Sequence, residues 1–253
     1  QTSDEVIITH DTNVPTVTAN SDGDLTCANV GVTLDGTGSS TGVDYTYEWT
    51  TPNGSIVSGE NSLTPEVNTA GTYHIMVTNT INGCTEIASV DVLVDGDLPA
   101  AAAGVADDLA CVIDQITLSG TASLGSNFTY LWTKGDGSIV SGNDGLNPIV
   151  NATGTYQLLV SDIDNGCTAI STVLVGEDIA SPDVSTDDPA SLTCVVSTVD
   201  LNAINNGVGN NYTYLWTSSD GNIVSGENGL TPTVDAVGSY VLEITNTING
   251  CTS

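Results

Sequence analysis

The stretch Tyr45-Thr46-Tyr47-Glu48-Trp49 decides the fold, and it recurs as Phe128-Thr129-Tyr130-Leu131-Trp132 and Tyr212-Thr213-Tyr214-Leu215-Trp216. In each copy, aromatic residues alternate with other residues, which is the period-two pattern of a β-strand with one buried face. The two outer aromatics and the central one therefore point into a core. The tryptophans are 83 and 84 residues apart, so the chain is a threefold repeat.

The residues around this strand repeat with the same period. A Gly-(Ser/Asn)-Ile-Val-Ser-Gly segment follows it at 54–59, 137–142 and 221–226. A Gly-(Thr/Ser)-Tyr start then opens another alternating strand, in which Tyr73, Ile75 and Val77 face one way. β-branched residues with Gly, Asn and Asp turns dominate, which predicts an antiparallel sandwich of about seven strands per repeat.

The order of these motifs resembles that of polycystic-kidney-disease (PKD) and related immunoglobulin-like domains. The matching pattern is Tyr-x-Trp, an Asn/Asp-Gly turn and Gly-Thr-Tyr-x-x-x-Val. The Leu-x-Cys start and Asn-Gly-Cys end of each repeat are similar to the tandem repeats of large secreted surface proteins of gliding and marine Bacteroidota, such as adhesins and appendages. The resemblance spans nearly the whole chain. It implies an all-β fold of three tandem immunoglobulin/PKD-like β-sandwiches in a linear rod.

The repeat pattern divides the chain into four segments. We expect an orphan strand of the kind that ends a repeat at 1–11, repeat 1 at 12–95, repeat 2 at 96–178 and repeat 3 at 179–253. Repeats 1 and 2 continue past Asn-Gly-Cys with a final strand, which repeat 3 lacks. Such a sheet exposes an unpaired edge.

The first ten residues look like the strand that repeat 3 lacks, because they precede Asp11–Pro15 as Val94 precedes Asp95–Pro99. We therefore expect Val6, Ile7 and Ile8 to add to the third repeat of a neighbouring copy by donor-strand complementation. Such a contact is head-to-tail and gives a linear polymer. The equal alternative is a slice of a longer repeat array, with the same junction made in cis.

The charge of the chain limits its partners. There are 31 acidic residues and one Lys or Arg, Lys134, for a net charge of −30. This excludes nucleic acid as a partner, because nothing neutralises the phosphates. No apolar run has the length of a membrane span, so we expect no membrane insertion. The carboxylates confer solubility, bind divalent cations, or do both.

Six cysteines, two in each repeat, predict disulfides and therefore a secreted or cell-surface location. We expect all six to be oxidised: Cys27, Cys84, Cys111, Cys167, Cys194 and Cys251. Pairs within a repeat, such as Cys27–Cys84, are the default. A bond between repeats, such as Cys27–Cys167, is the alternative, because the two cysteines of one immunoglobulin-like repeat lie at opposite ends of strands about 33 Å long. A disulfide needs Cα atoms within about 7 Å.

Acidic residues recur at the expected junctions, where linkers and domain ends supply the oxygen ligands that Ca²⁺ prefers. The candidate calcium ligands are Asp11, Asp95, Asp97, Asp107, Asp108, Glu177, Asp178, Asp183, Asp187 and Asp188. The alternative interpretation is that exposed linkers are simply polar. No loop matches a defined calcium motif, and no cofactor is required.

The sequence predicts no enzyme. His74 occupies a strand position where the other repeats have Gln157 and Val241, and His10 lies beside Asp11 near the start. Neither has the positioned partner that acid–base or nucleophilic catalysis needs. The first hypothesis is an extracellular structural repeat protein forming a stalk or a head-to-tail filament at the cell surface. The alternative is an adhesive module that recognises glycans or a partner cell surface.

Overall fold

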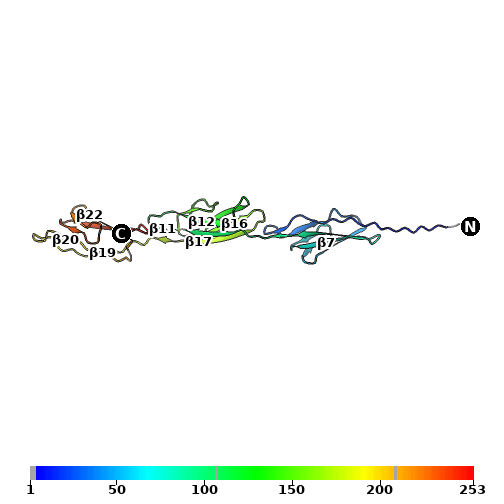
Figure 1. The fold of residues 1–253 in the computed structure, drawn as a ribbon, viewed down its shortest axis with the longest axis horizontal. Helices are drawn as coiled ribbons and strands as arrows, with labels where there is room; N and C mark the ends of the chain where they lie inside the picture. Colours follow the sequence, from blue (N-terminus) through cyan, green and yellow to red (C-terminus); the bar gives the residue numbers. More distant parts are fainter. Residues whose placement is uncertain (1–3, 106, 208–209) are drawn as a thin grey trace. The chain divides into compact units, whose positions relative to one another are not determined.

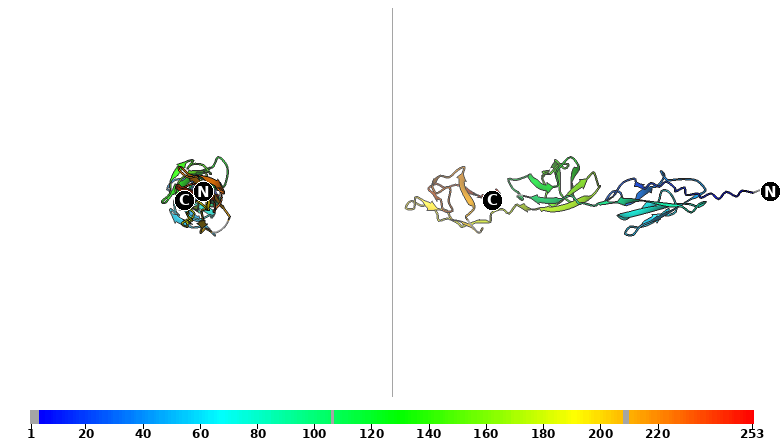
Figure 2. Two further views of the ribbon diagram at one scale, coloured as in Figure 1. Left: turned by 90° about the vertical axis from the view of Figure 1, so that its left-hand side faces the viewer. Right: turned by 45° about the vertical axis from the view of Figure 1, so that its right-hand side comes forward.

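The computed structural model describes residues 4–105, 107–207 and 210–253, and every regular element within these ranges is a β-strand (Figures 1 and 2). The prediction of an all-β chain is confirmed. No helix in the described ranges is long and apolar enough to cross a membrane.

Contacts divide the chain into two compact units whose limits differ from those of the repeats. Unit 1 comprises Gln1–Ala100, Ser123–Thr129 and Val160–Ala169, and unit 2 comprises Ala101–Ala122, Tyr130–Leu159 and Ile170–Ser253. Two segments of repeat 2, each a turn with the strand ends beside it, thus belong to the same unit as repeat 1. Each unit contains one place where successive repeats meet.

Repeat 1 forms two sheets that together contain seven strands. The order in the first sheet is β1 (Asn20–Ser21), β3 (Val32–Asp35), β6 (Glu66–Val67) and β5 (Ile56–Ser58). The order in the second sheet is β4 (Tyr45–Thr50), β7 (Gly71–Asn79) and β8 (Thr85–Val92). Lettered along the chain, these orders are A-B-E-D and C-F-G, which is the constant-type immunoglobulin topology.

Repeat 2 has the same two sheets. The first is β10 (Ala101–Val105), β12 (Ile116–Ala122), β15 (Ile149–Val150) and β14 (Ile139–Ser141). The second is β13 (Phe128–Lys134), β16 (Gly154–Asp162) and β17 (Thr168–Val175). Lys134 is the last residue of β13 and is exposed.

Repeat 3 has the first six strands of this topology. In it β19 (Val184–Thr186) pairs with β21 (Ala203–Asn205), and β20 (Val199–Asp200), β24 (Thr233–Val234) and β23 (Ile223–Ser225) form one sheet. The C-F pair is β22 (Tyr212–Ser218) and β25 (Tyr240–Asn246). No third strand pairs with β25 among the described residues, and Thr252 meets it through a single bridge to Thr245.

The last strand of repeats 1 and 2 continues beyond its sheet. After β8, β9 (Val94–Asp95) runs parallel to β2 (Leu25–Thr26) at the start of the same repeat. After β17, β18 (Glu177–Asp178) runs parallel to β11 (Leu109–Ala110). This parallel pairing directs the chain out of one sandwich and towards the next.

The alternating aromatic strands supply the core, as predicted. Trp49, Trp132 and Trp216 are all buried. The indole Nε1 of Trp49 donates to the carbonyl of Ser62 at 3.0 Å, as a buried indole usually requires. The tryptophans are therefore core residues and do not form an exposed platform for glycans.

A tyrosine at the start of the F strand closes each sandwich. The Tyr73 hydroxyl donates to the carbonyl of Thr69 at 2.6 Å and accepts from the amide of Ser55 at 3.1 Å. Tyr156 and Tyr240 donate in the same way to carbonyls four residues upstream. This is the tyrosine corner of immunoglobulin-like folds. A Cβ on Gly54 would lie 2.4 Å from the Tyr73 hydroxyl, which explains the glycine of the Asn-Gly turn.

We expect Tyr73→Phe to lower the free energy of unfolding by about 1–3 kcal/mol, because the Ser55 amide and the Thr69 carbonyl lose their partner in a largely buried place. Urea denaturation of the whole chain measures the change. Tyr45→Phe is the matched control, because the Tyr45 hydroxyl forms no hydrogen bond with any described residue. This substitution should change the free energy of unfolding little. Equal effects of the two variants would contradict this role of Tyr73.

Candidate functional site

The candidate functional site is the place where one repeat meets the next. It occurs twice, and each time it contains a disulfide. Cys27 bonds Cys167 with the Cα atoms 4.9 Å apart, within unit 1. Cys111 bonds Cys251 with the Cα atoms 5.1 Å apart, within unit 2. Each bond joins the first cysteine of a repeat to the second cysteine of the following repeat.

The expected within-repeat pairs Cys27–Cys84, Cys111–Cys167 and Cys194–Cys251 are therefore wrong, and the alternative between repeats is confirmed for Cys27–Cys167. The reason is the immunoglobulin topology. The first cysteine follows β2 at one end of the sandwich, and the second lies in the turn after β7 at the other end. The nine residues of β7 span about 30 Å, far beyond the reach of a disulfide.

We call the two places joint 1 and joint 2. Joint 1 comprises residues 24–28, 93–97 and 165–167, and joint 2 comprises residues 108–112, 176–180 and 249–251. The three segments of each joint are the start of a repeat, the end of its last strand, and the Asn-Gly-Cys turn of the following repeat.

A buried asparagine connects the segments of joint 1. Asn165 is 2% exposed, and its Nδ2 donates to Asp95 Oδ1 at 3.0 Å and to the carbonyl of Asp97 at 3.1 Å. The backbone carbonyl of Asn165 accepts from the backbone amide of Ala28 at 3.1 Å. A buried amide with all these partners fixes one geometry, since leaving any of them unpaired is costly.

Joint 2 repeats both hydrogen bonds that the asparagine side chain donates in joint 1. Asn249 is 1% exposed, and its Nδ2 donates to Asp178 Oδ1 at 2.9 Å and to the carbonyl of Ala180 at 3.0 Å. The second partner is a carbonyl, so Ala180 can replace Asp97 without loss of the bond.

Each residue of the Asn-Gly-Cys turn has its own structural function. The asparagine Oδ1 accepts from the cysteine amide, as in Asn165 with Cys167 at 2.8 Å. Gly166 has φ of 71°, and a Cβ on it would lie 2.4 Å from that of Ala28. The glycine therefore allows both the left-handed backbone and the close approach of the two repeats.

A carboxylate holds the end of the last strand in each joint. Asp24 Oδ1 accepts from the amide of Leu93 at 3.1 Å, and the amide of Leu25 donates to the carbonyl of Leu93 at 3.0 Å. In joint 2, Asp108 Oδ1 accepts from the amide of Gly176 at 3.2 Å. Four carboxylates at the joints thus accept hydrogen bonds from backbone or side-chain amides: Asp24, Asp95, Asp108 and Asp178.

This changes the interpretation of the calcium candidates. Asp95, Asp108 and Asp178 accept the hydrogen bonds described above, and Asp187 Oδ2 accepts from Asn202 Nδ2 at 2.7 Å. The remaining candidates lie exposed: Asp11, Asp97, Asp107, Glu177, Asp183 and Asp188. Within the described ranges, no three His, Cys, Asp or Glu side chains are grouped to hold a metal ion. Calcium binding stays a prediction.

Chelation tests that prediction directly. If calcium stiffens the joints, as the recurrence of acidic residues there indicates, EDTA should lower the melting temperature of the purified chain, and added Ca²⁺ should restore it. Mg²⁺ at the same concentration controls for screening. Superimposable melting curves with and without chelator would exclude a structural calcium site.

Among the residues that the structure describes, no catalytic group lies together with either histidine. His10 is exposed, and His74 lies on β7 opposite Thr50 and Ser89. The pKa of Asp35 is held below its ordinary value by hydrogen bonds from the Thr37 hydroxyl and amide, at an exposed turn. That the protein is not an enzyme stays a prediction.

Two cysteines contradict the expectation that every cysteine is paired within the chain. Cys84 and Cys194 are free in the described part of the chain. Cys84 is the second cysteine of repeat 1, and Cys194 is the first cysteine of repeat 3. When each first cysteine bonds the second cysteine of the following repeat, these two have no partner in the three repeats. Counting first and second cysteines along the repeats would have identified them.

Comparisons with known proteins define no family for this chain. No family model and no curated protein matches it. Solved structures that align with it include three N-terminal domains of the outer capsid protein Hoc of bacteriophage RB49, at 14% identity and a TM-score of 0.35, covering 95% of this chain and 94% of that one.

Two further structures align over most of this chain. The I9–I11 tandem of titin has 10% identity, a TM-score of 0.37 and coverage of 94% and 97%. The eight N-terminal immunoglobulin domains of Down Syndrome Cell Adhesion Molecule have 12% identity, a TM-score of 0.36 and coverage of 94% and 41%. Scores this low carry no argument about function, which rests on the joints themselves.

We expect Asn165→Asp to lower the free energy of unfolding by about 2–3 kcal/mol, because it removes both donated hydrogen bonds and sets a carboxylate against Asp95. Urea denaturation measures the change. Asn82→Asp is the matched control, because Asn82 is half-buried and donates only to the carbonyl of Asn13, at 3.0 Å. It should cost less than about 1 kcal/mol. A larger loss of stability from Asn82→Asp than from Asn165→Asp would contradict the importance of joint 1.

Proposed function

We propose that this protein is an extracellular structural repeat protein that bears tension as part of a stalk or filament at the cell surface. The observation that carries the proposal is the pattern of its two disulfides, each with a sequence separation of 140 residues. Structural disulfides persist in oxidising compartments outside the cytosol, which supports the extracellular location.

The two disulfide loops overlap. Residues 111–167 belong to both loops, because Cys111 lies inside the loop closed by Cys27–Cys167. A pull on the two ends therefore passes from Cys27 to Cys167, back along the chain to Cys111, and across to Cys251. This path contains 26 residues before Cys27, 55 between Cys111 and Cys167 and 2 after Cys251, about 83 besides the four cysteines.

This covalent path limits how far the protein can stretch. At about 3.5 Å per extended residue, the cross-linked chain reaches about 300 Å when every domain is unfolded, whereas the reduced chain reaches about 900 Å. Unfolding of one sandwich under load then neither separates the repeats nor lengthens the molecule to its full contour. That property suits a component that carries force.

The disulfides also stabilise the folded repeats. Closing loops of this length lowers the entropy of the unfolded chain by an amount equivalent to about 5 kcal/mol per bond on the chain-entropy model. The high negative charge opposes collapse and aggregation of such a surface-exposed array.

An adhesive function is the second hypothesis from the sequence, and it needs an exposed recognition surface. The tryptophans are buried in all three repeats, which removes the residues best suited to stack on a sugar. We therefore favour the structural function. Specific binding to an immobilised glycan or cell surface, lost on substitution of one exposed loop, would favour adhesion instead.

Single-molecule force spectroscopy tests the proposal. The oxidised chain, pulled from its ends, should stop lengthening at about 300 Å, and reduction should extend this limit to about 900 Å. Cys27→Ser leaves the Cys111–Cys251 bond and a path of 112 residues, so its limit should be about 400 Å. Cys84→Ser is the control and should match the unmodified chain. An oxidised chain that extends as far as the reduced one would contradict the proposal.

A further inference from the structure

We propose that a third joint, equivalent to joints 1 and 2, forms between two copies of this chain. Repeat 3 of one copy receives residues 4–11 of a second copy as a G strand beside β25, and Cys194 of the first copy bonds Cys84 of the second. The inference extends the proposed structural function, because it connects the copies head to tail by the chemistry that connects the repeats.

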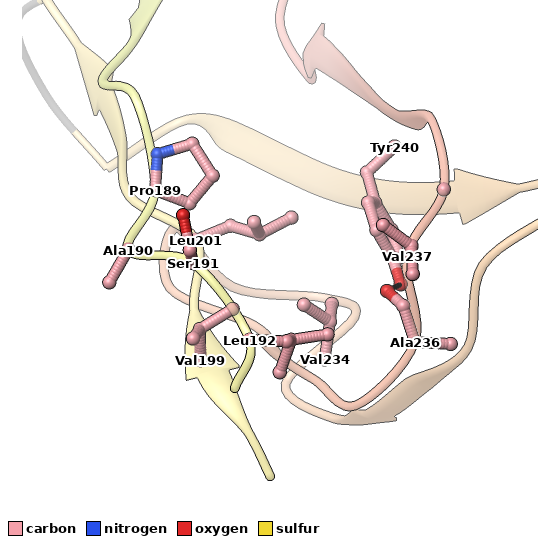
Figure 3. Close-up of a pocket in the computed structure, with 11 residues that line it drawn as sticks. Pro189, Ala190, Ser191, Leu192, Val199, Leu201, Val234, Ala236, Val237 and Tyr240 are labelled. Carbon is pink, nitrogen blue, oxygen red and sulfur yellow. Dashed lines mark hydrogen bonds between the residues drawn. The ribbon is translucent and has the colours of Figure 1, made fainter. Parts of the chain in front are cut away.

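The acceptor is a cavity of about 320 Å³ in repeat 3, drawn in Figure 3. Its lining is mainly apolar and comes from the start of the repeat and from the strands of its core. The lining includes Leu192, Val199, Leu201, Val234 and Tyr240.

Repeat 1 shows what such a cavity holds. The residues at the matching places are Leu25, Val32, Leu34, Val67 and Tyr73. In repeat 1 these five belong to one core cluster that also contains Val92, at the end of the G strand β8. Val92 is 1% exposed, and Val175, at the end of β17, is also 1% exposed. The cavity in repeat 3 therefore corresponds to the place that these valines fill.

The donor is the segment around Ile8. Pro15, Pro99 and Pro182 occupy the same place in the repeat, and counting back from them aligns Ile8 with Val92 and Val175. Ile8 is 92% exposed on its own copy and has no strand beside it. An exposed β-branched side chain that matches a fully buried position is suited to burial in another molecule.

The register of β7 with β8 defines how the donor would pair. Val92 lies opposite Gly71, and Val90 lies opposite Tyr73. By the same count, Ile8 would lie opposite Gly238 and point into the cavity, with Val6 opposite Tyr240. Ile7 takes the place of Asp91, on the outward side of the strand.

Repeat 1 also carries one half of a joint. The amide of Cys84 donates to Asn82 Oδ1 at 2.9 Å, and Asn82 donates to the carbonyl of Asn13, as Asn165 donates to that of Asp97. Gly83 has φ of 73°, but an added Cβ would meet nothing within 4 Å. The turn therefore has the form that it takes in joints 1 and 2, with open space where joint 1 has Ala28.

Repeat 3 carries the other half. The Thr193 hydroxyl accepts from the amides of Val195 and Val196, at 3.3 and 3.0 Å. The Thr26 hydroxyl accepts from the amides two and three residues on in the same way, at 3.2 and 2.9 Å, and thereby holds the turn that presents Cys27. Cys194 is thus held in the turn that forms the disulfide in joint 1, and it is exposed.

Formation of the bond needs a disulfide oxidant, such as oxidised glutathione. The thiolate of Cys194 attacks one sulfur of the oxidant, whose S–S bond breaks and releases one thiol. The thiolate of Cys84 then attacks the Cys194 sulfur of the mixed disulfide and releases the second thiol. Two protein thiols are oxidised, and one small disulfide is reduced to two thiols.

Mixing two single variants tests the covalent half of the inference. In a glutathione redox buffer, the unmodified chain should form a ladder of oligomers on a non-reducing gel, which reduction collapses to the monomer. Cys84→Ser alone and Cys194→Ser alone should each stay monomeric, and their mixture should give dimers and nothing larger. Peptide mapping of the dimer should find Cys84 joined to Cys194.

Other products would overturn the inference. Dimers of either variant alone would show symmetric bonds between like cysteines. A chain that stays monomeric under oxidation would contradict a disulfide between copies. Cys84 and Cys194 would then need other bonding partners, such as cysteines of further repeats in a longer array.

A substitution in the donor strand tests the other half. Ile8→Asp should reduce the rate and extent of ladder formation at least about tenfold, because the cavity then receives a carboxylate in place of an apolar side chain. Ile7→Asp is the matched control, since repeat 1 itself has Asp91 at that place, and it should form ladders normally. Ile8 is exposed in the single copy, so neither variant should change the melting temperature of the monomer.

Equal ladders from Ile8→Asp and Ile7→Asp would refute strand addition. The force measurement on a single chain does not depend on assembly, so the proposed function and this inference can fail separately.

Discussion

The structure depends on how the last strand of each sandwich leaves its sheet. In repeats 1 and 2 this strand completes the core with Val92 or Val175, pairs in parallel with the start of the same repeat, and then reaches the asparagine of the next repeat. One segment thus completes a core, closes the end of a sandwich and connects to its neighbour. A buried amide and a disulfide hold it there, so that folding of a repeat and connection to the next are coupled.

Neutral and charged polar side chains occupy different positions at the joints. The joints use a neutral amide, Asn165 or Asn249, as the buried donor, and place the charge of Asp95 or Asp178 at the exposed side. An amide can be buried with its hydrogen bonds made at modest cost, whereas a buried carboxylate without a cation would be expensive. Because Lys134 is the only Lys or Arg of the chain, almost no cationic side chain is present to pair with a buried carboxylate. A neutral asparagine therefore suits the buried position at each joint.

Much of the fold could be predicted from the sequence because it is encoded locally. Alternation at Tyr45–Trp49 gave the buried strand, and the 83–84-residue period gave the repeats. The joints could not be predicted in the same way, since Asn165 meets Asp95 across 70 residues. Strand periodicity does not show which ends of two sandwiches meet. The length of the strands did indicate Cys27–Cys167 as the alternative to Cys27–Cys84, because the two cysteines of one repeat lie at opposite ends of its sandwich.

Disulfide mapping of the purified, unreduced protein tests the central claim most directly. The protein is cleaved at its acidic residues under conditions that prevent thiol exchange, and the linked peptides are identified by mass spectrometry. We predict that peptides containing Cys27 and Cys167 are linked, and that peptides containing Cys111 and Cys251 are linked. Linkage of Cys27 to Cys84, or of Cys194 to Cys251, would mean that each repeat is closed on itself and would contradict this account of the joints.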